Sequence, residues 1–126
     1  MTVTQVSQPV FVFGSNLGGR HGAGAAKVAK HVWDADYGVG VGPTGMSYAI
    51  PTKDEDLNVL PLNVVGKHVR DFIRYASDKN NKDILFYVTA FGTGLAGNSK
   101  KDILALFGDI QQLPYNIVFT KDWFFE

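Results

Sequence analysis

Three long polar side chains, those of Asn16, Arg20 and His21, stand in one segment, within a turn (residues 14–26) that is otherwise made of small and apolar residues. The segment, residues 10–32, reads VFVFGSNLGGRHGAGAAKVAKHV, and five of its glycines lie within residues 14–24. The amide of Asn16 can both donate and accept hydrogen bonds, which suits recognition of a hydroxyl group. The imidazole of His21 can serve as a general base near neutral pH. These residue types indicate a site that binds, or acts on, a ligand carrying hydroxyl groups.

Both residues also have a structural interpretation. Asn16 is of a type that forms turns by hydrogen-bonding its own backbone. His21 could orient the loop or contact solvent instead of acting as a base. His31 and His68 fall within predicted helices and are expected at the surface or at the boundary of the core. The acidic run at residues 54–56 is typical of a solvated loop.

Twelve of the fourteen glycines fall in three loops, at residues 14–24, 38–45 and 92–97. The first and third loops each follow a predicted buried strand and precede a predicted helix. In an open α/β sheet, ligands bind at the carboxyl ends of the strands. Bare backbone there lets N–H groups approach an anion, and a helix N-terminus adds a favourable dipole. The two loops predict a cleft for a phosphate-rich ligand, although glycine in a single loop can simply make a tight turn.

The common phosphate-binding motifs do not fit. Residues 40–45 satisfy G-x-G-x-x-G, but Pro43 lies inside the motif and the next predicted element is a strand rather than a helix. Residues 19–24 have the glycine spacing of a P-loop, but Ala25 stands where that loop needs lysine. Neither G-x-S-x-G nor H-E-x-x-H occurs. Any anion site must therefore be of another kind.

Hydrophobic patterning predicts strands alternating with helices, which indicates an α/β sheet with helices on both faces. Pro61 suits the start of the second predicted helix. Ser99 and Asp102 are spaced as a capping box at the start of the third helix. The strands are expected at residues 10–16, 46–51, 83–90 and 116–123, and the helices near 23–35, 61–78 and 99–112.

Each predicted helix has an apolar stripe at helical spacing. The closing segment KDWFFE is aromatic and is expected either to pack as the last strand or to expose Trp123 and Phe124 to a partner. The three stripes are Ala25, Val28, Ala29, Val32 and Trp33; then Val65, Val69, Phe72, Ile73 and Ala76; and then Ile103, Leu106, Phe107 and Ile110.

Composition narrows the function classes. The chain has 126 residues, no cysteine and a formal net charge of zero. The length suits one domain over residues 1–126. Zero net charge argues against a basic surface for extended nucleic acid, and the lack of cysteine removes thiolate nucleophiles and thiolate metal sites. No apolar run reaches membrane-spanning length, and the polar start lacks a signal peptide, so we expect a cytoplasmic protein without membrane contact. The sequence points to no metal and no cofactor.

Three segments together resemble the macro domain, a family that binds ADP-ribose and related nucleotides. FGSNLGGRHGAGAAKVA is similar to its first active-site strand, glycine-rich loop and alanine-rich helix. GPTGMSYAIPTK is similar to its next landmark, a Gly/Thr loop leading into a short strand. VTAFGTGLAGNSKKDILALF is similar to its phosphate-wrapping loop and the helix that follows. The segments come in the family order and span residues 11–107.

The resemblance implies a three-layer α/β/α macro-domain-like fold with a mixed sheet, and it assigns roles to the loops. Asn16 would contact the hydroxyls of the distal ribose, Phe91 would stack on a ribose or base unless it belongs to the core, and Thr93 would donate its hydroxyl to phosphate. His21 stands where many members of the family carry a small or apolar residue, and it joins Asn16 as an expected catalytic residue through its own chemistry as a base. Backbone N–H groups of both loops would face the ribose and the diphosphate. The implied ligand-binding residues are Gly18, Gly19, Gly22, Ala23, Gly24, Phe91, Gly92, Thr93, Gly94, Leu95, Ala96 and Gly97.

The chain departs from the family pattern in ways that bear on function. The usual two asparagines at the end of the first strand are reduced to Asn16. The strands that precede this segment in the family are missing or shortened here, and the aspartate that commonly holds adenine is absent with them. Three hypotheses follow: a hydrolase of an ADP-ribosyl ester or ADP-ribose phosphate, a non-catalytic binder that reads or sequesters a NAD-derived nucleotide, and a protein-interaction domain that keeps only the fold. The partner implied by the first two is a small nucleotide.

Overall fold

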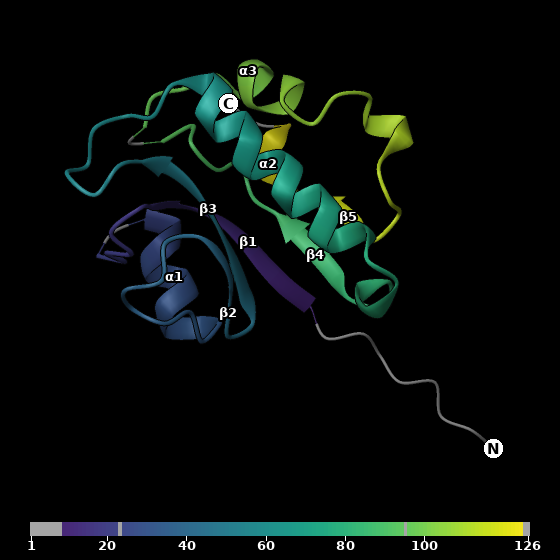
Figure 1. Ribbon diagram of the computed structural model, residues 1–126, viewed down its shortest axis with the longest axis horizontal. Coiled ribbons are helices and arrows are strands. Elements are labelled where there is room, and N and C mark those ends of the chain that lie inside the picture. Colours follow the sequence, from purple (N-terminus) through teal and green to yellow (C-terminus); the bar gives the residue numbers. More distant parts are fainter. Residues whose placement is uncertain (1–8, 23, 95, 125–126) are drawn as a thin grey trace.

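The computed structural model describes residues 9–22, 24–94 and 96–124, and these build one five-stranded sheet (Figure 1). The strand order is β2-β3-β1-β4-β5. Strand β1 is parallel to both β3 and β4, β4 is parallel to β5, and β2 is antiparallel to β3. The expected α/β fold with a mixed sheet is therefore confirmed. The strands are β1 (Pro9–Asn16), β2 (Gly42–Thr44), β3 (Ser47–Lys53), β4 (Leu85–Val88) and β5 (Ile117–Phe119).

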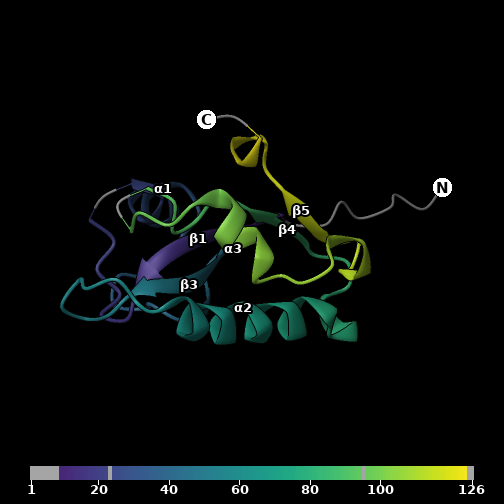
Figure 2. The same cartoon turned by 90° about the horizontal axis from the view of Figure 1, so that it is seen from above.

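Three α-helices cover the sheet, α1 on one face and α2 with α3 on the other (Figure 2). Short 3₁₀ helices lie at Lys79–Asn81, Ile110–Gln112 and Lys121–Trp123. None of the helices within the described ranges combines the length and the apolar character that crossing a bilayer would require. The α-helices are α1 (Gly24–Val32), α2 (Leu62–Ser77) and α3 (Lys100–Ala105).

Helix α2 matches the sequence prediction closely. It begins directly after Pro61, whose fixed φ suits the position before the first helical residue. Its apolar stripe is buried against the sheet residues Val12, Ile50 and Phe86, while Ile73 at the edge of the stripe is half-buried. This side holds the larger of the two hydrophobic cores. The buried positions of the α2 stripe are Val65, Val69, Phe72 and Ala76.

Helix α1 forms where it was expected but buries a different face. The buried positions are Ala26 and Ala29, whereas Val28 and Val32 from the predicted stripe are 45% and 67% exposed. The predicted stripe was therefore wrong at these two valines. The large ring of Phe13 projects from β1 toward the helix, and small alanine side chains let the helix lie close to it.

Helix α3 is shorter than the expected 99–112. Ser99 caps it as predicted, because its hydroxyl oxygen accepts a hydrogen bond from the N–H of Asp102 at 3.0 Å. The helix ends at Ala105, and Gly108 then takes a left-handed φ of 73°, which breaks the helical path. The chain resumes as the 3₁₀ turn at Ile110–Gln112, so Ile110 is exposed rather than part of a buried stripe.

The last strand is also shorter than predicted. β5 stops at Phe119, and the expected strand residues up to position 123 form a 3₁₀ turn instead. Trp123 is buried in the large core, where its indole N–H donates to the carbonyl oxygen of Val88 at 2.7 Å. Phe124 is 74% exposed. Of the two aromatic residues expected either to pack or to be exposed, Trp123 therefore packs in the core and Phe124 is exposed.

The short strand β2 was not predicted, because residues 38–45 carry four glycines and one proline and have no strand-like pattern. It pairs with β3 in an antiparallel hairpin through Gly42, Pro43 and Thr44. A strand does follow the G-x-G-x-x-G stretch, which confirms that these glycines are not a dinucleotide-binding turn.

Candidate functional site: a cleft between two glycine loops

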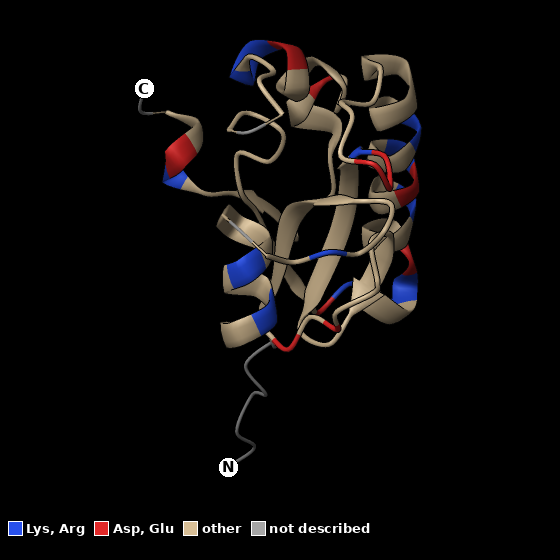
Figure 3. Ribbon diagram, turned by 90° about the vertical axis from the view of Figure 1, so that its left-hand side faces the viewer, with Lys and Arg blue, Asp and Glu red and all other residues tan. Residues whose placement is uncertain are grey.

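A cleft of about 730 Å³ lies at the carboxyl ends of β1, β3 and β4. It is lined by the end of β1, the start of α1, the end of β3 and the loop after β4. This edge of the sheet faces the viewer in Figure 3. The two glycine loops, residues 14–24 and 92–97, therefore meet at one cleft, as the sequence predicted.

Only part of the first loop lines the cleft. Gly22 and Gly24 do, and a Cβ added at either would meet no atom within 4 Å, so both glycines face open space. Gly18, Gly19 and His21 are not in the lining. Ala23, also expected to bind ligand, lies outside the described residues.

Asn16 lies at the cleft, but its amide is occupied by the loop. Its Oδ1 accepts a hydrogen bond from the N–H of Arg20, and its Nδ2 donates to the carbonyl oxygen of Arg20, both at 2.9 Å. The side chain is 8% exposed. The turn-forming interpretation of Asn16 is thus what the geometry supports, since this clamp fixes the shape of the loop beside the cleft.

His21 faces away from the cleft and is 2% exposed. Its ring stands edge-on to Phe13 and Tyr37, and Nε2 lies 3.0 Å from the carbonyl oxygen of Val39. Burial lowers the pKa of His21 below 6.5, the hydrogen bond to Val39 opposes that shift, and Lys30 adds to it. The neutral ring with Nε2–H donating to Val39 is therefore favoured. This geometry does not support the expected role as a base at the cleft; the imidazole instead holds the loop on the core.

Gly18 and Gly19, expected to offer their N–H groups to a ligand, have other surroundings. The N–H of Gly19 donates to the carbonyl oxygen of Asn16, and a Cβ on Gly19 would stand 2.2 Å from the carbonyl carbon of Gly38. Gly40 packs in the same way, because its Cβ would stand 1.9 Å from the carbonyl oxygen of Asn16. The bare backbone at this point lets the first and second glycine loops touch.

The loop after β4 presents unoccupied N–H groups to the cleft. Gly92, Thr93 and Gly94 line it, and no hydrogen bond within the described residues uses their backbone N–H groups. Gly92 has a left-handed φ of 73°, so the backbone turns sharply here. A Cβ on Gly94 would meet no atom within 4 Å. Successive free N–H groups in such a turn form a concavity that binds anions.

The other residues of this loop that were expected to bind the ligand have different surroundings. Phe91 touches the cleft, but its ring packs edge-on against Phe107 and Trp123 in the core, so the core interpretation holds and no face is open for stacking. The hydroxyl of Thr93 donates to the carbonyl oxygen of Ala90 at 2.6 Å and is not available as a donor to phosphate. Ala96 lines the cleft, Gly97 does not, and Leu95 lies outside the described residues.

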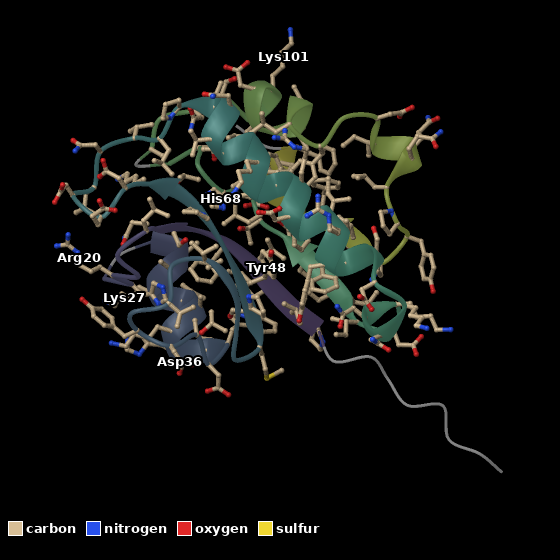
Figure 4. The ribbon with its side chains drawn as sticks, viewed as in Figure 1. Arg20, Lys27, Asp36, Tyr48, His68 and Lys101 are labelled. Carbon is tan, nitrogen blue, oxygen red and sulfur yellow. The ribbon has the colours of Figure 1, made fainter. Side chains whose placement is uncertain are left out.

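Of the four charged residues that line the cleft, only Arg20 was singled out from the sequence. Lys53 at the end of β3 and Lys100 at the start of α3 both line it, together with Arg20 and a single carboxylate, that of Asp122. The guanidinium of Arg20 donates to the carbonyl oxygen of Glu55, and Figure 4 shows Arg20 at the rim of the molecule. These residues come from four separate segments, so no local motif signals them.

The N-terminus of α1 also points at the cleft. Gly24, Ala25 and Ala26 line it, and the first N–H groups of a helix have no partner within the helix. No acidic side chain lies in this first turn to neutralise the positive end of the helix dipole. The cleft therefore combines free N–H groups from two loops with a surplus of basic side chains, an arrangement suited to phosphate.

Asp122 connects the cleft to the end of the chain. Its Oδ2 accepts a hydrogen bond from the N–H of Ala90 at 3.0 Å, and its other oxygen accepts from the hydroxyl of Thr120. Oδ2 thus holds the loop after β4, and the other oxygen holds the turn after β5. Within the described ranges, no group of three or more His, Asp or Glu side chains is arranged to hold a metal ion. The chain matches no protein-family model, and comparisons with curated proteins and with solved structures likewise find no match.

Proposed function

We propose that the chain is a macro-domain-like protein that binds an ADP-ribose-type nucleotide in the cleft. The observation that carries the proposal is the meeting of the two glycine loops at one cleft, with free N–H groups at Gly92, Thr93 and Gly94. The basic side chains of Arg20, Lys53 and Lys100 support a ligand with negative charge. A volume of about 730 Å³ is within the usual range for small-molecule sites.

Binding without hydrolysis is the better-supported form of this function. The two residues expected to be catalytic are engaged elsewhere, Asn16 in clamping Arg20 and His21 in the core behind the loop. The one carboxylate in the lining, Asp122, accepts hydrogen bonds on both oxygens. A general base must reach the proton that it removes, and these groups support no such role. A non-catalytic reader or sequestering protein fits this arrangement.

The first test is a thermal-shift screen with ADP-ribose, cyclic ADP-ribose isomers, NAD and AMP, followed by calorimetry on any compound that stabilises the protein. Product analysis of the same mixtures then separates a binder from a hydrolase. We expect ADP-ribose or a close relative to raise the melting temperature without being consumed. If none of these nucleotides stabilises the protein, the proposal is wrong.

Gly94→Val tests the phosphate role of the second loop. The added side chain enters open space in the cleft, so the fold should survive while the approach of a phosphate to the backbone is blocked. We expect loss of ADP-ribose binding with an unchanged melting temperature of the free protein. The matched control is Gly18→Val, outside the lining, where a Cβ has only ordinary contacts at 3.5 Å and beyond. Equal affinity of wild type and Gly94→Val would contradict the proposed site.

A further inference from the structure

A second pocket, of about 530 Å³, lies at the opposite end of the sheet from the cleft. It is formed by the start of β3, the last turns of α2 and the 3₁₀ turn that follows. Tyr48 is the second residue of β3, whereas the cleft is lined by the last two residues of the same strand, Thr52 and Lys53. The pocket residues are Tyr48, Asp71, Arg74, Tyr75, Asp78, Asn80 and Asn81.

Tyr48 forms the floor of this pocket. The residue is 6% exposed, and its ring packs against Phe72 and Tyr75 with centroid distances of 5.0 and 5.2 Å (Figure 4). Its hydroxyl makes no hydrogen bond to any described residue, yet it is not among the polar atoms sealed inside the protein. The hydroxyl of an otherwise buried tyrosine therefore opens into the pocket without a partner. The hydroxyl is therefore open to a hydrogen bond from a ligand group that enters the pocket.

The rim offers hydrogen-bond acceptors that no described residue uses fully. One oxygen of Asp71 is 3.5 Å from the guanidinium of Arg74, and Oδ1 of Asp78 accepts from the N–H of Asn80. That leaves one oxygen on each carboxylate without a hydrogen bond to the described residues. The side-chain amide of Asn81 donates from Nδ2 to the carbonyl oxygen of Tyr75, and no described residue donates to its Oδ1.

The charge of the residues that line the pocket decides whether it attracts a cation or an anion. Two carboxylates, Asp71 and Asp78, face one guanidinium, Arg74, so the lining carries a net negative charge. Burial and the neighbouring Asp71 carboxylate raise the pKa of Tyr48 to about 12, so the phenol keeps its proton at neutral pH. The ring of Tyr75 adds an aromatic surface of the kind that attracts cations. An anion would be repelled here, in contrast to the cleft.

We propose that this pocket binds an ammonium or guanidinium group, held by Asp71, Asp78 and the hydroxyl of Tyr48. Asp71 lies in α2, and Asp78, seven positions later, is the residue directly after its last turn, so the two positions are about 10 Å apart along the helix axis. A linear dication such as agmatine can place one positive group near each carboxylate. The source of the cation is either a free amine or a basic side chain of another protein, and both offer the same chemistry.

The test is a titration followed by two-dimensional amide NMR and by calorimetry, with agmatine, butylamine and the peptide acetyl-Gly-Arg-Gly-amide as probes. We expect agmatine to shift signals at the end of α2 and to bind more tightly than the monocation butylamine. Tighter binding of the peptide than of agmatine would assign the site to a protein side chain. Failure of all three probes to bind at this end of the sheet would overturn the proposal.

Three variants locate the binding. Tyr48→Phe removes only the hydroxyl, Asp71→Asn removes one charge at nearly constant shape, and Asp78→Asn does the same with a residue that can still cap the 3₁₀ turn. Each should weaken agmatine binding by about tenfold, because Tyr48→Phe removes one hydrogen bond to a charged group and each asparagine variant removes a negative charge that attracts the cation.

The control is Asp34→Asn, which changes the net charge equally on the other face of the sheet, at a left-handed position that asparagine tolerates. Agmatine should bind Asp34→Asn as it binds the wild type. Unchanged affinity in all three pocket variants, or an equal loss in Asp34→Asn, would show that the cation is attracted by general charge and not by this pocket. ADP-ribose binding, measured in the same variants, should be unaffected, so failure here is separate from failure at the cleft.

Discussion

Asn16 illustrates how one side chain can shape a site without serving the ligand directly. Its amide is engaged with both the N–H and the carbonyl oxygen of Arg20, which closes a turn of the first loop beside the cleft. Because the residue is nearly buried, water cannot easily replace either bond. The same amide type that suggested ribose recognition is thus used to hold the backbone that surrounds the cleft.

Asn16→Ala should therefore lower stability as well as binding. We expect the free energy of unfolding to fall by about 1–3 kcal/mol, since two backbone groups lose their partners. Urea denaturation measures this, and calorimetry with ADP-ribose should show a parallel loss of affinity as the loop loosens. The control is Asn80→Ala at an exposed position, which should stay within about 0.5 kcal/mol of wild type. Weaker binding with unchanged stability would restore the direct ribose role.

His21 should make the fold sensitive to acid. Its folded pKa lies below 6.5 because of burial, while the unfolded imidazole titrates near 6.5. Below that pH the unfolded state binds more protons than the folded state, so stability present at pH 7 is lost as the pH falls from about 6.5 through the folded pKa. Burial lowers the pKa of His68 as well, and its contribution has the same sign.

The measurement is the free energy of unfolding in urea at pH values on both sides of 6.5. His21→Phe keeps an aromatic ring between Phe13 and Tyr37 but removes the titration, so its stability should fall less steeply with acid than that of wild type. The control is His31→Gln, which removes an exposed imidazole. A pH dependence of His21→Phe that is identical to wild type would contradict this account.

At the scale of elements, the contact between the first and second glycine loops fixes one wall of the cleft. Gly19 and Gly40 approach backbone atoms of the opposite loop so closely that neither has room for a Cβ. The neighbouring glycines Gly22 and Gly24 are different, since they face open space in the cleft. Glycines within one loop thus serve two purposes, loop packing and access to the cleft.

Gly40→Ala and Gly22→Ala should separate these purposes. Gly40→Ala would place a carbon 1.9 Å from the carbonyl oxygen of Asn16, so the two loops must move apart. We expect a loss of at least about 2 kcal/mol in the free energy of unfolding, in the range found for severe overpacking. Gly22→Ala, with free space for its Cβ, should leave stability within about 0.5 kcal/mol of wild type. Equal stability of the two variants in thermal or urea unfolding would contradict the close loop contact.

At the scale of the whole molecule, the chain separates its charges although it is neutral overall. The cleft at one end of the sheet has three basic side chains and one acidic one, whereas the pocket at the other end has two acidic side chains and one basic. The two ends of the sheet thus carry opposite surpluses of charge. The molecule is thereby suited to attract opposite charges at its two ends.

Lys53→Gln should weaken ADP-ribose binding by about tenfold, because it removes one hydrogen bond to a charged phosphate. The side chain of Lys53 is half-buried at the cleft, while Lys82 is exposed outside it, so Lys82→Gln is the matched control. Calorimetry at low and at high salt should show affinity falling with salt, and falling less steeply in Lys53→Gln. Equal affinities of the two variants would remove Lys53 from the site.

The sequence alone determined the order of the strands and helices apart from β2, and the place of the cleft. Buried strands such as β1 and β4 carry dense β-branched and aromatic residues, and α2 has a wide apolar stripe after a proline, so local patterning suffices for them. The cleft follows from the same local order, because each of its two loops joins a strand to a helix and parallel strands end at one edge. The helix end at Gly108 and the turn before Trp123 were misjudged, since their capping depends on where the neighbouring chain lies.

Only the tertiary structure decided what individual side chains do. Nothing local distinguishes an asparagine that clamps its own loop from one that awaits a ribose, or a histidine facing the core from one facing a cleft; the partners of His21 include Val39, eighteen positions away. The cleft's basic residues and the partnerless hydroxyl of Tyr48 likewise depend on segments far apart in sequence. Hydrophobic periodicity predicts which side of a helix or strand is buried. The direction of a polar side chain and its hydrogen-bond partner are instead set by contacts between elements that are distant in sequence.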